Sequence, residues 1–509
     1  MNFTQWLKRP ITLIGILVLV LWVGVAVYYL GGNKKGALKW PAAVTILPVD
    51  LKADEWEEWY GNYFQGRKIG YSQTSRKAIP EGYLYSDHTH LWLNVNGESL
   101  EADTNTKAEV GKDLRLKKIN FRLHSKEADT VIDGRVEGTK IVLGIKAGGK
   151  RTEQVINIQE APLTMLTVRD YLLRDPQAKL EVGKKFKLPF FEPMSMANAE
   201  LDIEVLGTES LKVGDKIMSV FRLKESFKGD DSVTWVTPDG KTIKEYSPRG
   251  FVVMLEPREE AEKPDSKSEP APDLVQALAI PVQGLINNPR ETRYLKIILN
   301  KVVISGFDIA GHRQTLNERT AEVRVESLDQ VRSYTLPWTE IAGGGEEAKE
   351  SMKATPFIPL GNVTLANAAR EAAGGKTDSL KAARSIMDWV NRSLKKVPTF
   401  AIPSALQILK DREGDCNEHT LLFVALARQA GLPARMVAGI VFLEGKFYYH
   451  AWAEAFVGGV GDGWIALDPV FGQLPADATH IRFISGDLDR QVEITRFVGY
   501  LETQVVEVR

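Results

Sequence analysis

The chain has 509 residues, which is longer than one compact domain usually runs and predicts roughly two to four domains. Apolar residues make up 44% and charged residues 26%, and 65 Lys and Arg nearly balance 66 Asp and Glu, so the composition excludes a largely disordered chain and argues against a nucleic-acid partner. Cys416 is the only cysteine, which excludes an intrachain disulfide and a zinc site built on several cysteines.

Near the start of the chain, residues 11–30 read ITLIGILVLVLWVGVAVYYL and carry no charged side chain. A run of this length can cross the hydrocarbon core of a membrane as a helix. The rival interpretation is a cleaved signal peptide, whose apolar region is usually shorter and ends in a small-x-small site. We therefore expect residues 1–40 to form a cytoplasmic tail, an uncleaved transmembrane anchor and a juxtamembrane segment. The predicted location is the bacterial inner membrane, single-pass, with the bulk of the chain in the periplasm or outside the cell.

Residues 41–255 are rich in short alternating runs bounded by turn residues, which predicts an exported, mostly antiparallel β domain. Asn96-Gly97 follows one such run and indicates a two-residue hairpin. Two more hairpins are expected over 131–145 and 233–246, and a short helix over 161–175.

The middle of the chain changes composition twice. Residues 256–273 read EPREEAEKPDSKSEPAPD, and their prolines and charges, without a large apolar residue, predict a charged Pro-rich linker or loop. Residues 274–345 are β-rich again, with the best strands over 293–304 and 321–325, and predict a small β-rich domain or an extension of the C-terminal domain.

Residues 346–509 open with a helical period and continue with strands, which predicts an α+β domain. Asp378 can cap one helix, and Gly431 can end another. The expected elements are helices over 367–373, 379–394, 404–409 and 416–430 and strands over 434–443, 447–457 and 464–467. The predicted fold class is therefore α+β: an N-terminal transmembrane helix, mostly antiparallel β domains and a C-terminal α+β domain.

Three residues of this last domain point to chemistry. Cys416 opens a predicted helix, where unpaired N–H groups and the helix dipole favour a thiolate nucleophile. His450 lies in the next predicted hairpin and could serve as the base that takes the thiol proton. Asp468 follows the third strand and could accept from the other ring nitrogen of the histidine. Taken singly, each has an ordinary structural explanation, but together they predict a Cys–His–Asp site.

The blocks Gly414-Asp415-Cys416-Asn417-Glu418-His419, LLFVALARQAGLPAR, Tyr449-His450-Ala451-Trp452-Ala453-Glu454 and Gly463-Trp464-Ile465-Ala466-Leu467-Asp468-Pro469 occur in this order. In this respect the stretch over roughly 360–483 resembles the bacterial transglutaminase-like family, a branch of the papain-like cysteine enzyme fold. The resemblance implies a catalytic triad of Cys416, His450 and Asp468. It does not cover the β-rich region before it.

By that resemblance, the protein would be a transglutaminase-like cysteine protease, amidase or acyltransferase that forms a thioester on Cys416. Hydrolysis and transfer to an amine both stay open, as does the second oxyanion donor, for which Gln407, Trp389 and Trp452 are candidates. The alternative is a non-catalytic scaffold that uses the same fold to bind partners. A dry, sealed Cys416 would favour that scaffold.

We expect no cofactor and no bound metal. Asp477 with His480 offers too few ligands, and His88 and His90 share a strand face that is more simply solvated. The expected partners are a protein or peptide substrate, the inner membrane through residues 11–30 and an envelope protein docked on the β domain. That domain could instead hold an acyl chain, which would require a deep apolar cavity.

Overall fold

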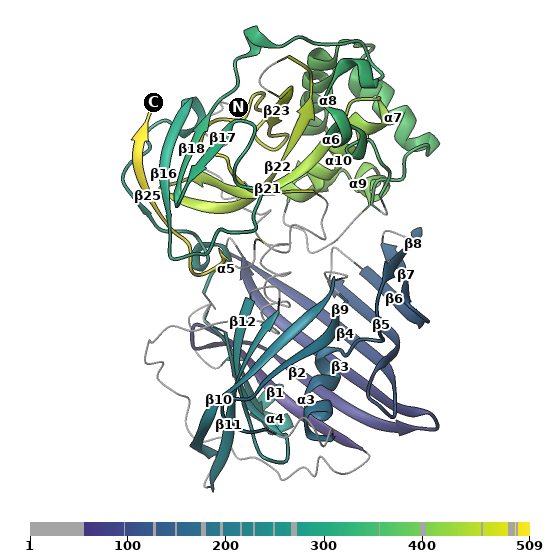
Figure 1. Ribbon diagram of the computed structural model, residues 1–509, viewed down its shortest axis with the longest axis vertical. Helices are drawn as coiled ribbons and strands as arrows, with labels where there is room; N and C mark the ends of the chain where they lie inside the picture. Colours follow the sequence, from purple (N-terminus) through teal and green to yellow (C-terminus); the bar gives the residue numbers. More distant parts are fainter. Residues whose placement is uncertain are drawn as a thin grey trace. The chain divides into compact units, whose positions relative to one another are not determined.

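The computed structural model describes residues 55–509 except 96, 126–128, 148–149, 175–179, 194–196, 214–215, 228–229, 248–249, 266–271, 356, 398–403, 460–461, 487–493 and 495–496. These residues divide into two compact units, 55–277 and 278–509, which we call the N-terminal and C-terminal units (Figure 1). The finer division predicted from the sequence, with boundaries at 255, 273 and 345, stays a prediction.

The N-terminal unit is built on one 14-stranded antiparallel sheet with the order β8-β7-β6-β5-β4-β3-β2-β1-β14-β13-β12-β11-β10-β9. Its strands are β1 (Trp56–Phe64), β2 (Arg67–Ile79), β3 (Gly82–Val95), β4 (Glu98–Gly111), β5 (Leu116–Ser125), β6 (Asp129–Glu137), β7 (Lys140–Ala147), β8 (Lys150–Asn157), β9 (Lys185–Glu192), β10 (Ala197–Val213), β11 (Lys216–Phe227), β12 (Asp230–Val236), β13 (Thr242–Tyr246) and β14 (Phe251–Glu256).

Short turns explain most of this order, because most successive strands pair with their chain neighbours. The three predicted hairpins are confirmed as β3–β4, β6–β7 and β12–β13. The exception is the pairing of β1 with β14. It joins the first and last strands in chain order, with Trp59 opposite Glu256. This long-range pair unites two meanders into one sheet.

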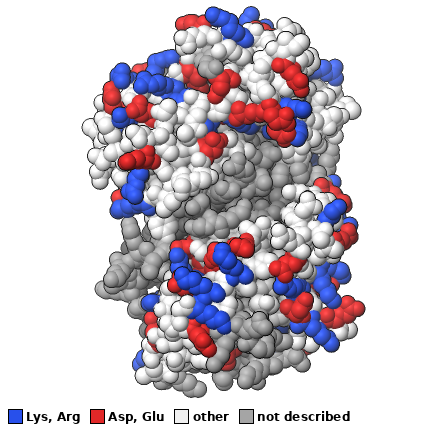
Figure 2. Space-filling view, viewed as in Figure 1, with Lys and Arg blue, Asp and Glu red and all other residues white. Residues whose placement is uncertain are grey.

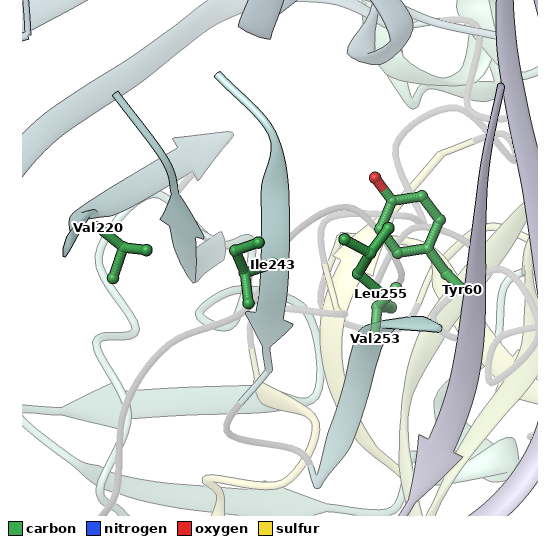
Figure 3. Close-up of a cluster of buried hydrophobic side chains, with 5 residues drawn as sticks. All are labelled: Tyr60, Val220, Ile243, Val253 and Leu255. Carbon is green, nitrogen blue, oxygen red and sulfur yellow. The ribbon is translucent and has the colours of Figure 1, made fainter. Parts of the chain in front are cut away.

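A buried apolar cluster includes residues of both strands of this pair and of β11 and β13 (Figure 3). Tyr60 comes from β1, Val220 from β11, Ile243 from β13, and Val253 and Leu255 from β14. All five side chains are buried. Removal of their apolar surface from water is what stabilises the long-range junction.

The predicted helix over 161–175 is present as α3 (Met165–Arg174), which packs on β3 and β9. Two largely buried ion pairs hold it to the sheet. Asp170 pairs with Arg76 on β2, and Arg169 pairs with Glu58 on β1 at 2.9 Å. A short helix, α4 (Arg258–Ala261), packs on β1 and β2, and α5 (Leu274–Ala277) packs on β3.

The C-terminal unit contains two larger sheets and a group of helices. The five-stranded sheet has the order β15-β25-β16-β18-β17, and the four-stranded sheet has the order β23-β22-β21-β24. Their strands are β15 (Val282–Gln283), β16 (Tyr294–Asn300), β17 (Gln314–Asn317), β18 (Thr320–Arg324), β21 (Ala434–Leu443), β22 (Lys446–Phe456), β23 (Trp464–Leu467), β24 (Ile481–Ser485) and β25 (Glu502–Val508). A short parallel pair joins β19 (Lys395–Lys396) to β20 (Glu413–Gly414). The helices are α6 (Gly345–Glu350), α7 (Val363–Ala373), α8 (Ser379–Ser393), α9 (Ala405–Asp411) and α10 (Cys416–Gln429), with short 3-10 turns at Pro289–Glu291, Leu328–Gln330 and Glu340–Ala342.

Helix α10 is the centre of this unit. Its residues from Cys416 to Arg428 are buried, and it packs on α7, α8 and α9 and on strands β21 and β22 (Figure 1). The apolar run along most of its circumference predicts this burial. The predicted cap of α8 is confirmed, since the Asp378 carboxylate accepts from the N–H of Lys381 at 2.9 Å.

The prediction of a transmembrane helix is corrected by the structure. Among the described residues, no helix is long and apolar enough to cross a membrane. The longest described helix, α8, has 15 residues, fewer than the roughly 20 that a bilayer core requires. The segment for which a span was predicted, residues 11–30, lies outside the described residues. The fold class is therefore mostly antiparallel β with a C-terminal α+β unit, and the predicted single-pass inner-membrane location is not supported.

Basic and acidic side chains are interspersed over the described surface on the face shown in Figure 2. This mixture agrees with the near-zero net charge of the chain. The absence of a nucleic-acid partner stays a prediction.

Candidate active site

Cys416 is the first residue of α10 and lies at the edge of the C-terminal core. Asp415 caps the helix, and its carboxylate accepts from the N–H of Asn417 at 2.9 Å within a capping box. The Sγ of Cys416 accepts a hydrogen bond from the N–H of Ala451 at 3.3 Å. This bond joins the sulfur to the residue after His450 on β22.

His450 lies on β22, and Asp468 comes directly after the neighbouring strand β23. Nε2 of His450 donates to Oδ2 of Asp468 at 2.7 Å. Because a carboxylate only accepts, the hydrogen lies on Nε2, and Nδ1 is left as the acceptor of a neutral imidazole. The backbone N–H groups of Val470 and Phe471 donate to Oδ1 of Asp468 at 2.6 and 3.0 Å. The Phe471 ring also stacks on the imidazole, with centroids 5.2 Å apart.

The structure thus brings together the three residues that the sequence singled out. Cys416 and His450 are 3% and 6% exposed, and Asp468 is fully buried. Each comes from a different element, so only the packing of α10 on β22 and the pairing of β22 with β23 bring them together.

The electrostatic setting of Cys416 differs from the one that its helix position predicts. Burial raises the pKa of the Cys416 thiol well above its usual value, and the carboxylates of Asp415, Glu418 and Asp468 raise it further. The hydrogen bond from Ala451 opposes the rise but does not reverse it. Burial also lowers the pKa of His450. At neutral pH the resting groups are therefore a neutral thiol on Cys416 and a neutral imidazole on His450.

We expect the rate of alkylation of Cys416 by iodoacetamide in the folded full chain to be still rising at about pH 9. The reason is that the thiolate is the nucleophile, and the raised pKa keeps the thiol protonated below that pH. The control is the same chain unfolded in guanidinium chloride, where the rate should reach half its maximum at about pH 8.5. Because the chain has one cysteine, all alkylation maps to this residue. A folded-state plateau below about pH 8 would contradict the neutral pair.

A second histidine shares the carboxylate of Asp468. Nε2 of His480, on the turn before β24, lies 3.0 Å from Oδ2 of Asp468. Its Nδ1 lies 3.3 Å from both the backbone oxygen and the carboxylate of Asp477. Arg290, from the 3-10 turn Pro289–Glu291, forms an ion pair with Asp477 at 2.9 Å. Sequence reasoning missed Arg290, and it weighed His480 with Asp477 as a weak metal pair.

The part of the chain that holds Cys416, His450 and Asp468 is similar to known proteins. Residues 366–469 match the family model of the transglutaminase-like superfamily. The chain contains a transglutaminase-like domain. The matched range includes Cys416, His450 and Asp468 but not Arg290 or His480.

An uncharacterized protein of Mycobacterium leprae (strain TN) is 25% identical over 258 residues, which cover 41% of this chain and 89% of that protein. Among solved structures, a candidate cysteine protease from Cytophaga hutchinsonii is 14% identical, covering 43% of this chain and 89% of that one, with a TM-score of 0.29. A β-barrel-like protein of unknown function from Brucella abortus is 13% identical, covering 39% and 94%, with a TM-score of 0.31.

One group in the transglutaminase-like region has the composition of a metal site. Suitable atoms of His450, Asp468 and His480 all lie within 4.8 Å of one another. Hydrogen bonds account for this cluster, because Oδ2 of Asp468 already accepts from Nε2 of both rings. A metal ion would have to displace both of these hydrogen bonds. The three side chains are therefore better explained as a hydrogen-bonded cluster than as a metal site.

Of the three candidates for a second oxyanion donor, two donate to carboxylates of their own surroundings and one lies next to His450. Trp389 donates its ring N–H to Glu371 at 3.1 Å, and the amide of Gln407 donates to Asp411. Trp452 is buried and stacks on His450 with ring centroids 6.3 Å apart. Trp452 is therefore the candidate that lies beside the site.

The other candidate positions have structural partners. Glu418 accepts from the N–H of Asp415 at 2.8 Å, and Nδ1 of His419 donates to the carbonyl of the same residue at 2.6 Å. In the N-terminal unit, His88 and His90 both contact Oδ1 of Asp103, at 3.0 and 2.9 Å. These hydrogen bonds account for the position of each of the four side chains.

The N-terminal unit has a cavity of about 110 Å³ between α3 and the sheet. Apolar side chains of α3 cover it, but the sheet side carries the carboxyl groups of Asp87, Glu225 and Glu245. This is not the deep apolar cavity that an acyl chain would require.

Proposed function

We propose that the transglutaminase-like domain is a thiol enzyme that acts on amide bonds of a protein or peptide substrate, with hydrolysis as its main reaction. Cys416 is the nucleophile, His450 is the acid and base, and Asp468 orients His450. The observation that carries the proposal is the convergence of these groups, with Sγ bonded to the N–H next to His450 and Nε2 bonded to Asp468. The family match over the same residues supports it.

In the first half-reaction, Sγ attacks the amide carbonyl carbon while its proton passes to Nδ1 of His450. Since the resting pair is neutral, this transfer accompanies attack rather than preceding it. The backbone N–H of Cys416, at the start of α10, donates to the oxyanion. The C–N bond then breaks, the leaving amine takes the proton from His450, and a thioester stays on Cys416.

In the second half-reaction, His450 takes a proton from water, and the resulting hydroxide attacks the thioester carbon. The C–S bond breaks, a carboxylic acid leaves, and the proton returns to the sulfur. If an amine enters instead of water, the same steps form a new amide. The acceptor therefore decides between hydrolysis and transfer.

One observation favours a second candidate function, that of a non-catalytic scaffold. Cys416 is only 3% exposed, and burial raises the pKa of its thiol. A non-catalytic scaffold does not need a thiol that substrate can reach. The enzyme proposal therefore requires that substrate reaches a sulfur that is covered in this structure.

The test incubates the full chain with a panel of peptide p-nitroanilides, with and without an added fluorescent primary amine. We expect amine release and a hydroxylamine-sensitive acyl group on Cys416, detected by mass spectrometry. Cys416→Ala and His450→Ala should lower the rate at least about 10²-fold. Transfer is recognised by incorporation of the fluorescent amine into product.

The matched control is His124→Ala, which removes an exposed histidine of the N-terminal unit. It should leave the rate unchanged. Equal rates in the wild type and Cys416→Ala, together with no adduct on the sulfur, would overturn the enzyme proposal in favour of the scaffold.

A further inference from the structure

We propose that Arg290 and His480 are positioning residues that brace the reactive pair from outside the matched domain. The expected effect on the reaction rate rests on the proposed function. The contacts that hold His450 and Asp468 in place do not depend on it. It has two arms, one running through His480 to the carboxylate and one running through Phe471 to the imidazole. Arg290 lies at the start of both arms.

The first arm fixes the carboxylate of Asp468. Its Oδ1 accepts from the backbone N–H groups of Val470 and Phe471, and its Oδ2 accepts from His450 and His480. With both oxygens occupied, rotation of the carboxylate would break several hydrogen bonds in a site that excludes water. His480 therefore locks the orientation in which Asp468 holds Nε2 of His450.

The arrangement around His480 also fixes its charge. Nε2 faces Oδ2 of Asp468, and Nδ1 faces the carboxylate and backbone oxygen of Asp477. Each ring nitrogen thus faces an acceptor, an arrangement that favours the imidazolium over the neutral ring. Burial alone would lower the pKa of His480, but Asp477 and Asp468 raise it.

Arg290 completes the first arm. Asp477 accepts from the N–H and hydroxyl of Thr479 at 2.8 and 2.5 Å and pairs with Arg290 at 2.9 Å. The guanidinium also donates to the carbonyl of Phe442, on β21. It thus holds Asp477 beside His480 while bonded to the central sheet.

The second arm uses the same guanidinium. Its carbon lies 4.5 Å from the centre of the Phe471 ring, and that ring stacks on His450 at 5.2 Å with an interplanar angle of 16°. A cation over an aromatic face is attractive, and a planar guanidinium stacks better than an ammonium. Arg290 therefore restrains the ring plane of His450 as well as the carboxylate that binds it.

The charges of the brace act on His450. Burial lowers its pKa, Asp468 opposes this, and the positive charges of His480 and Arg290 add to the lowering. Other charged or titratable groups near this cluster are Lys396, His419 and Cys416, with the carboxylates of Asp415 and Glu418 next to the thiol. Removal of the His480 charge should therefore raise the pKa of His450 and move the acid limb of the rate profile to higher pH.

The test compares His480→Gln, Arg290→Gln and Arg290→Lys in the full chain with two exposed controls, His124→Gln and Arg293→Gln. The first readout is titration of the histidine rings by NMR with ¹³C-labelled histidine, which needs no substrate. We expect His480→Gln to raise the pKa of His450 by about one unit. Arg290→Gln should shift it in the same direction, and Arg290→Lys, which keeps the charge, should shift it less.

The second readout is the pH profile of acylation of Cys416. We expect His480→Gln and Arg290→Gln to lower the rate roughly 10- to 100-fold, as loss of a group that orients a histidine does elsewhere. Unchanged ring titration and unchanged rates in both variants would overturn the brace. If the wild type shows no acylation, the proposed function fails, yet the NMR titration still decides the brace. Should His480→Gln not fold, Phe471→Leu tests the second arm by the same two readouts.

Discussion

Replacement of Glu454 with glutamine should lower the free energy of unfolding by about 3–5 kcal/mol, because it leaves two buried arginines short of a negative charge. Glu454 is 2% exposed and lies on β22. Its carboxylate accepts from Arg435 at 2.9 and 2.6 Å and from Arg482 at 3.0 and 3.3 Å. These arginines come from β21 and β24, so the carboxylate joins three strands of the central sheet.

The two arginines also contact other groups: Arg435 pairs with Glu347, and Arg482 lies 3.6 Å from the carboxylate of Asp308. Arg435 lies over the Trp464 ring at 4.2 Å. Arg482 donates to the carbonyl of Asp308 at 3.0 Å, before the strand β17. The measurement is urea unfolding followed by circular dichroism at about pH 7. The control is Glu444→Gln in the exposed β21–β22 turn, which should change stability by less than about 0.5 kcal/mol.

The same residue predicts a pH dependence. Burial alone would raise the pKa of Glu454, but Arg482 and Arg435 lower it from 4.5 to about 2. A depressed folded-state pKa contributes stability that is present above the unfolded value and is lost as pH falls through the folded value. Between about pH 5 and about pH 2 the free energy of unfolding of the wild type should therefore fall by about 3 kcal/mol more than that of Glu454→Gln. Parallel stability curves for the two proteins over this range would contradict the pairing.

Local patterns in the sequence predict much of the C-terminal unit. The strand expected over 434–443 matches β21, and that over 464–467 matches β23. The helix expected from Cys416 is α10, and Asp378 caps α8 as predicted. These elements could be predicted because periodicity, caps and turn residues are properties of neighbouring residues.

Features set by distant residues could not be predicted in this way. The pairing of β1 with β14 joins the first and last strands of this region in chain order at the centre of the sheet, and no local signal encodes it. The role of Arg290 could not be predicted, because a single arginine in a β-rich segment has no sequence pattern that indicates a contact with Asp477 or Phe471. The pKa of Cys416 could not be predicted locally either. Its helix position favours the thiolate, but burial and three carboxylates raise the pKa of the thiol.

Replacement of Asp468 with asparagine should abolish most of the proposed activity, with a loss on the order of 10⁴-fold in the rate of Cys416 acylation. The carboxylate accepts on both oxygens, from two backbone N–H groups at Oδ1 and from two imidazoles at Oδ2. An amide offers one oxygen and one N–H₂ group. The oxygen is needed by the backbone donors, so the N–H₂ group would face Nε2 of His450.

That orientation reverses the tautomer of His450. An N–H₂ donor requires Nε2 to be the acceptor, which places the remaining ring proton on Nδ1, the nitrogen that must take the proton of Cys416. The acid–base function would be lost, and Nε2–H of His480 would lose its acceptor as well. The measurement is the acylation rate with peptide p-nitroanilides, together with NMR of the ring nitrogens, where the His450 resonances should report the exchanged tautomer. A variant that retains the Nε2–H tautomer and more than about a tenth of the rate would show that Asp468 does not set the proton position, and the assignment of its role would have to be abandoned.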